Sequence, residues 1–189
     1  MNIRADVRRM RTVSRKLAIA IVALAMLFVG IQGASAATTH SSGQQDPSKN
    51  VRRALVTIPW YGVFDNLEYT INGTEVVLSG QVVEPVTKHD ADSAVKHVRG
   101  VTQVVDNITV LPLSGFDNQI RRAEYRAIFS DSSLGRYSLG AVPTIHIIVN
   151  NGHVTLEGAV MNQMDANIAR IRALGVSDVF SVTSNLRIG

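Results

Sequence analysis

Apolar and polar positions follow one alternating pattern, V-x-L-x-G-x-V, in two stretches of the chain: VVLSGQV (76–82) and VTLEGAV (154–160). This alternation is typical of a strand with one buried face. An Asn-Gly pair precedes each stretch, and before that pair lies another alternating segment, at 67–71 and again at 145–149. Asn-Gly favours the tight turn of a β-hairpin. The pattern therefore predicts one hairpin in each half of the chain, at an offset of 78 residues.

Helical periodicity flanks the first hairpin. A helix is predicted over 51–58, with Pro59 ending it, and a second helix from about Pro85 to just before Gly100. The closing strand of this half has its apolar residues at Val104, Ile108 and Val110.

The second half repeats this order. A helix is expected after a possible N-cap at Asp117. Its predicted buried stripe is Ile120, Ala123 and Ala127. The next helix ends before Gly175, and its apolar residues with helical spacing are Met161, Met164, Ile168, Ile171 and Leu174. The closing strand has its apolar residues at Val182, Leu186 and Ile188.

These elements predict an α+β fold of two tandem αββαβ units, each a small mixed sheet packed against two helices. The first unit is expected over 49–113 and the second over 114–189, joined near PLSG (112–115). Units of this length have small hydrophobic cores, so packing between them would add stability.

The first 36 residues have the form of a secretory signal peptide. Residues 1–16 contain six basic residues and one acidic residue, an apolar run covers 17–31, and small residues occupy Ala34 and Ala36. We therefore predict cleavage after Ala36, followed by a flexible polar leader over 37–48. The alternative is an uncleaved membrane anchor, but the apolar run is shorter than the about 20 residues that a spanning helix needs.

The predicted signal peptide carries most of the positive charge. The whole chain has 19 basic and 15 acidic residues, a formal charge of +4. Without residues 1–36, 13 basic and 14 acidic residues remain, which gives −1. The charge balance therefore does not support nucleic-acid binding. The chain also has no cysteine, which excludes disulfides, Cys-ligated metal and the acylated cysteine of a lipoprotein.

No residue pattern indicates an active site. The sequence has no G-x-S-x-G, P-loop or G-x-G-x-x-G motif. The five histidines lack the i, i+4 spacing and the carboxylate partner of a helical zinc site. Gly80 and Gly158 lie inside predicted strands, where a bulge or a helix that crosses over a position without a side chain explains them better than a ligand does. We expect no enzymatic activity, no cofactor and no metal.

Both halves resemble the BON domain, a family named for bacterial osmotic-stress and nodulation proteins. Its signature is an αββαβ unit in which an N/G turn precedes V-x-L-x-G-x-V, followed by a helix, G-V and V-x-x-x-L-x-V. Here G-V occurs at 100–101 and 175–176, and the closing motif reads VVDNITV (104–110) and VTSNLRI (182–188). The resemblance covers about residues 48–189.

The resemblance implies an envelope or periplasmic protein that is associated with osmotic or envelope stress, binds phospholipid surfaces and has no active site. Two features depart from the family. The segment SDSSLGRYSLGAVPT (130–144) lengthens a connection in the second unit, and the Cys-based lipid anchor of some relatives is absent. Any membrane attachment of the exported chain would therefore be reversible.

One candidate surface is the stretch PWYGVF (59–64), which contains Trp60, Tyr61 and Phe64. If exposed, this aromatic cluster would enter a membrane interface. The alternative is that it covers the core of a small domain or fills the seam between two domains. The small size of the unit favours the second interpretation.

The other candidate surface is the helix QIRRAEYRAIF (119–129). At 100° per residue, its predicted surface side carries Arg122, Tyr125, Arg126 and Phe129, with Arg121 at the edge. A basic and aromatic face suits an anionic lipid headgroup layer. The alternative is that the two rings pack under 130–144 while the arginines stay solvated.

The sequence thus predicts a protein that binds rather than catalyses. The expected partner is the anionic phospholipid surface of the bacterial envelope, and nucleic acid is not expected. The alternative is a periplasmic protein–protein adaptor that uses the domain seam or an exposed strand edge. Lipid species, stress signal, oligomeric state and domain orientation are left open.

Overall fold

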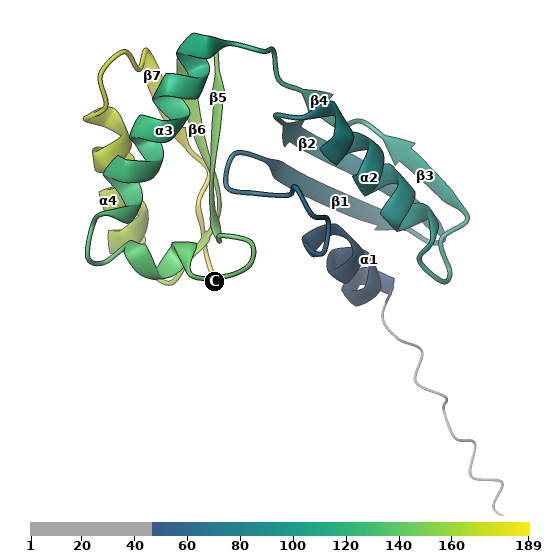
Figure 1. The fold of residues 1–189 in the computed structure, drawn as a ribbon. Coiled ribbons are helices and arrows are strands. Elements are labelled where there is room, and N and C mark those ends of the chain that lie inside the picture. The colour runs from purple at the N-terminus through teal and green to yellow at the C-terminus, as the bar shows by residue number, and fades with distance from the viewer. Residues whose placement is uncertain (1–46) are drawn as a thin grey trace, which may run out of the picture. The chain divides into compact units, whose positions relative to one another are not determined.

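The structure is a computed structural model that describes residues 47–189 (Figure 1). The predicted signal peptide (1–36) and the leader up to residue 46 lie outside the described residues. The described residues belong to one compact unit. No helix among them is long and apolar enough to cross a membrane.

The first αββαβ unit has two helices and one small mixed sheet. Its elements are α1 (Pro47–Val56), β1 (Asn66–Asn72), β2 (Glu75–Val82), α2 (Pro85–Lys96), β3 (Gln103–Asp106) and β4 (Thr109–Val110). Strand β2 is central: β1 pairs with it antiparallel, and β3 and β4 pair with it parallel. Helix α1 begins at Pro47, so the last two residues of the predicted leader are helical.

The second unit repeats this topology and adds a short 3-10 helix. Its elements are α3 (Gly115–Phe129), η1 (Gly135–Ser138), β5 (Ile145–Asn150), β6 (His153–Val160), α4 (Gln163–Leu174), β7 (Ser181–Ser184) and β8 (Arg187–Ile188). Strand β6 pairs antiparallel with β5 and parallel with β7 and β8. The predicted α+β fold of two tandem units is therefore confirmed.

The alternating pattern of the central strands places their apolar residues in the two cores. Val76, Leu78 and Val82 of β2 are buried, as are Val154, Leu156 and Val160 of β6. The first core also contains Val51 and Leu55 of α1 with Ala91 and Val95 of α2. The faces that the period-2 pattern predicted for these strands are confirmed.

The two strand glycines are explained by close packing between strands. Gly80 and Gly158 have φ values of +112° and +110°. A Cβ on either would lie 2.1 Å from a backbone oxygen, that of Asn66 or of Thr144. Both features require glycine, and neither involves a ligand.

The large apolar residues whose spacing predicts α4 are not the ones that the helix buries. Its buried residues are Asp165, Ala166, Ala169 and Ala173. By contrast, Met161, Met164, Ile171 and Leu174 are exposed, and Ile168 is half-buried. Small alanines let the helix approach the sheet closely, so the alanine side is buried although the other side has the larger apolar residues.

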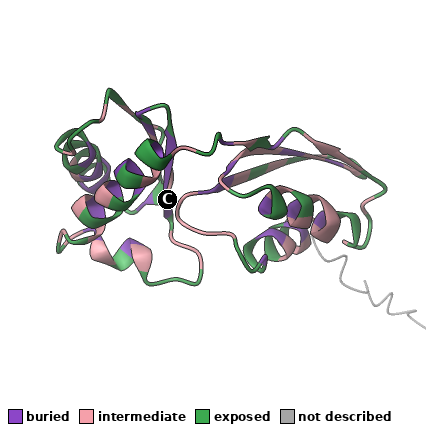
Figure 2. Cartoon of the chain, turned by 45° about the horizontal axis from the view of Figure 1, so that its top comes forward, coloured by how far each residue is buried: buried purple, intermediate pink, exposed green. Residues whose placement is uncertain are grey.

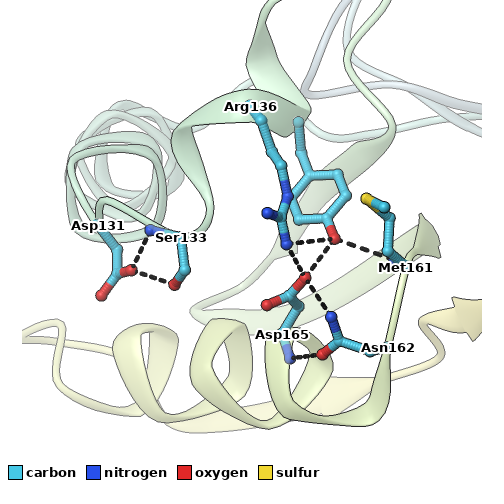
Figure 3. A network of polar contacts seen from close by, with 7 residues as sticks. Asp131, Ser133, Arg136, Met161, Asn162 and Asp165 are labelled. Carbon is cyan, nitrogen blue, oxygen red and sulfur yellow. Dashed lines mark hydrogen bonds and ion pairs between the residues drawn. The ribbon is translucent and has the colours of Figure 1, made fainter.

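The segment 130–144 is an integral part of the second core. Leu134 and Tyr137 are buried with the residues of that core. The Tyr137 hydroxyl donates a hydrogen bond to the Asp165 carboxylate and accepts one from the Met161 backbone N–H at 2.9 Å (Figure 3). Arg136 forms an ion pair with the same carboxylate. These contacts fasten the segment to the start of α4 and, led by the Tyr137 hydrogen bond, lower the pKa of Asp165.

Candidate functional site: the exposed face of helix α3

Helix α3 is capped by Ser114, whose side-chain oxygen accepts a hydrogen bond from the Asp117 N–H at 3.0 Å. The prediction that Asp117 is the N-cap is therefore wrong, because Asp117 lies in the first turn and is buried. Its carboxylate accepts hydrogen bonds from the backbone N–H groups of Asn151 (3.0 Å) and Gly152 (2.8 Å) in the β5–β6 turn. Asp117 thus fastens the start of the helix to the hairpin.

We expect Asp117→Ala to lower the free energy of unfolding by about 2 kcal/mol, because two backbone donors, of which that of Gly152 is buried, lose a charged acceptor. Asp117→Asn keeps one acceptor oxygen and should cost about half as much. Urea unfolding followed by circular dichroism measures both values. Equal stability of all three proteins would show that the carboxylate does not hold the turn.

The sheet-facing side of α3 carries more charged side chains than predicted. Its buried residues are Asp117, Ile120, Arg121, Glu124 and Ile128, while Ala123 and Ala127 of the predicted stripe are only half-buried (Figure 2). Glu124 is fully buried, and neither of its carboxylate oxygens has a hydrogen-bond partner among the described residues. Burial raises its pKa to about 8. The burial of Glu124 was not predicted from the sequence, because a glutamate within a helix normally faces solvent.

The prediction that Arg121 belongs to the binding surface is wrong. Its side chain is 2% exposed. The guanidinium donates hydrogen bonds to the Val149 carbonyl oxygen at 2.7 Å and to the Asn118 side chain at 2.6 Å. Burial lowers its pKa, partly offset by the charge of Asp117. Arg121 therefore ties α3 to β5 and does not face a partner.

The outer face of α3 carries the other predicted residues. Arg122, Tyr125 and Arg126 are exposed, and Phe129 is half-buried. Within residues 47–189, Arg122 and Arg126 have no ion pair or hydrogen bond from their side chains. Both guanidinium groups are therefore available to an anionic partner.

Aromatic side chains from two parts of the chain meet beside these arginines. The Tyr125 ring contacts Phe129 at a centroid distance of 5.0 Å and Phe64 edge-on at 6.4 Å. A groove of about 270 Å³ lies here, lined by Val63, Phe64, Arg122, Tyr125 and Arg126. Tyr125 thus packs between Phe129 on its own helix and Phe64 of the first unit.

The three aromatic residues of 59–64 have different environments. Tyr61 stacks on the His146 ring at 5.5 Å, and burial raises the pKa of its hydroxyl to about 12. Phe64 packs against the second core. Trp60 is 68% exposed. Tyr61 and Phe64 therefore pack against other residues, as the interpretation of 59–64 as a packing cluster predicts. Of the three aromatic residues, only Trp60 is exposed to solvent.

Backbone contacts hold the Phe64 segment against the edge of β5. The Ile147 N–H donates to the Val63 carbonyl oxygen at 2.7 Å, and His146 Nδ1 lies 3.2 Å from the Gly62 carbonyl oxygen. The Asp65 carboxylate accepts hydrogen bonds from the backbone N–H groups of Gly62 and Val83. These contacts hold the Phe64 side of the groove beside α3 in place. The local sequence pattern does not predict the hydrogen bond between Ile147 and Val63.

A second groove lies on the other side of the two arginines. It has a volume of about 440 Å³, and its lining includes Phe116, Arg122, Arg126, Val176 and Asp178. Arg122 and Arg126 thus line both grooves, and the acidic residue Asp178 also lines the second groove. In the described part of the chain, no three His, Asp or Glu side chains gather to hold a metal ion.

The comparisons with known proteins point to one family. The family model described as "BON domain" matches residues 50–112 and 129–189. Helix α3 lies almost entirely outside these matches, although it packs on the second sheet. The comparison with curated proteins gave no match.

Among solved structures, two similar chains come from CdsD, a structural protein of the Type III secretion system of Chlamydia trachomatis. One is 11% identical and covers 75% of this chain and 91% of its own length, with a TM-score of 0.29. The other, its C-terminal domain, is 14% identical and covers 77% and 98%, also with a TM-score of 0.29. At these TM-scores the likeness carries no argument about function.

Proposed function

Because the chain belongs to the BON domain family, we propose that it is a non-enzymatic binding protein of the bacterial periplasm that attaches to anionic phospholipid surfaces. Its binding face is the outer side of α3, with Arg122, Tyr125 and Arg126. The proposed compartment rests on the predicted signal peptide. A role in osmotic or envelope stress is part of the same proposal.

The observation that carries this proposal is a pair of arginines, beside an apolar groove, whose side chains have no partner within residues 47–189. Arg122 and Arg126 lie one helical turn apart, so two phosphate groups of a lipid layer could each meet one guanidinium. Tyr125 and Phe64 line the groove that lies between the two arginines and the first unit. Basic residues hold a surface to anionic lipid at about 1 kcal/mol each, and rings add shallow burial.

The test is co-sedimentation of residues 37–189 with vesicles of phosphatidylcholine alone or mixed with phosphatidylglycerol. We expect binding to the anionic vesicles only, and loss of that binding at high salt. Arg122→Gln/Arg126→Gln should weaken it about 30-fold, as expected for two charges at about 1 kcal/mol each.

The matched control is Arg52→Gln/Arg53→Gln, which removes the same charge from two exposed positions on α1. It should bind almost as wild type does. An equal loss in both variants would show that only net charge matters. Absence of binding to every vesicle would refute the proposal and turn the search to the alternative, a periplasmic protein–protein adaptor.

A further inference from the structure

Helix α4 presents large apolar side chains to solvent. Met164 is 70% exposed and Ile171 is 64% exposed. With the half-buried Ile168 between them, they have i, i+4, i+7 spacing and fall within an arc of about 60°. We call Met164, Ile168 and Ile171 the outer ridge. Met164 and Ile171 lie opposite the buried side of the helix, which is made by Ala166, Ala169 and Ala173, while the half-buried Ile168 also packs against the second core.

The outer ridge lies beside the basic face of α3. Helices α3 and α4 pack against each other and on the same sheet, as one layer (Figure 1). The groove that Arg122 and Arg126 line also includes Val176 and Ser177, which follow directly after α4. The outside of this layer therefore combines exposed cations on one helix with an apolar ridge on the next.

We propose that the outer ridge of α4 inserts into the headgroup and acyl boundary of an anionic bilayer while the α3 arginines contact its phosphates. This inference rests on the proposed function and adds α4, which lies outside the surfaces assigned from the sequence. Apolar burial and charge attraction act together in helices that lie in a membrane interface. Arg170, exposed on the flank of α4 and without an ion pair among the described residues, adds a further cation.

The charge of the surroundings favours a lipid surface over a second copy of the chain. A symmetric contact across this layer would bring the exposed arginines of both copies into one interface. Like charges that face each other oppose such a contact. An anionic headgroup layer meets the same arginines with opposite charge and receives the ridge in its apolar boundary.

Site-specific labelling tests the insertion directly. The chain has no cysteine, so Met164→Cys in residues 37–189 provides a single position for an environment-sensitive fluorophore. We expect a blue shift with phosphatidylglycerol-containing vesicles and quenching by lipids brominated on the acyl chain. The control is Thr183→Cys on β7, an exposed position whose neighbour Val182 packs on the core, so the label faces away from the helices.

Affinity measurements separate the ridge from the arginines. Met164→Gln/Ile171→Gln should bind anionic vesicles about tenfold more weakly and keep the salt sensitivity of wild type. Because both positions are exposed, the fold should keep its stability. Arg122→Gln/Arg126→Gln should instead lose the salt-sensitive part of the binding.

Three outcomes would overturn the inference, and they are distinguishable. If vesicles bind with dependence on Arg122 and Arg126 but the label at 164 shows no shift, the ridge does not insert and the proposed function stands. If wild type binds no vesicle, both proposals fail. If ultracentrifugation shows a dimer that Met164→Gln/Ile171→Gln converts to a monomer, the ridge is an interface between copies.

Discussion

Replacing Glu124 by methionine is expected to raise the free energy of unfolding by about 3 kcal/mol at pH 7. The carboxyl group is fully buried on α3 and has no hydrogen-bond partner among the described residues. Its pKa rises from 4.5 to about 8 in the folded protein because burial disfavours the charged form. At pH 7 the folded protein must therefore keep this carboxyl protonated or bury its charge.

The sign of the pH dependence follows from the raised pKa. The stability associated with Glu124 is fully present below pH 4.5, where folded and unfolded chains are both protonated. It falls as the pH rises, by about 1.4 kcal/mol per unit, and is lost once the pH passes the folded pKa of about 8. The wild-type protein should thus be less stable at pH 8 than at pH 5, relative to Glu124→Met.

Urea unfolding of both proteins from pH 4 to pH 9 measures this difference. Methionine is unbranched and close to glutamate in size, so it should fill the same space without a cavity. Glu124→Gln serves as the control, because it removes the charge but keeps a buried polar group. It should also flatten the pH dependence, with a smaller gain in stability. If the free energy of unfolding changed with pH in the same way for wild type and Glu124→Met, the carboxyl would not be buried in its protonated form.

Gly158→Ala is expected to destabilise the protein by about 3 kcal/mol. The added Cβ would lie 2.1 Å from the Thr144 backbone oxygen, and the φ of +110° disfavours any residue with a side chain. Strand β5 would have to move away from β6, which breaks the hairpin at the centre of the second unit. Thermal unfolding followed by circular dichroism gives the loss.

The matched control for this substitution is Gly175→Ala, in the same unit. Gly175 has a φ of −85°, and its nearest contact for a new Cβ is an Arg172 oxygen at 3.4 Å. This variant should stay within about 0.5 kcal/mol of wild type. A Gly158→Ala protein as stable as Gly175→Ala would contradict the close approach of the two strands.

Local patterns in the sequence are enough to predict the strands, the turns and the number of units. An alternation such as Val76-x-Leu78 is a local property, since successive side chains of a strand point to opposite faces whatever packs against them. Asn151-Gly152 acts locally too, through the backbone angles of the turn. These features were sufficient to predict two αββαβ units and the buried faces of β2 and β6.

Which sides of α3 and α4 face the sheet depends on tertiary packing. Met164 and Ile171 are the larger apolar residues of α4, yet the helix buries Ala169, because small side chains allow the closest approach of helix to sheet. On α3, Arg121 is inside because the Val149 carbonyl oxygen lies within reach of its guanidinium. Both choices depend on the distance and the groups of a partner element that is remote in the sequence, and no periodicity within one helix encodes them.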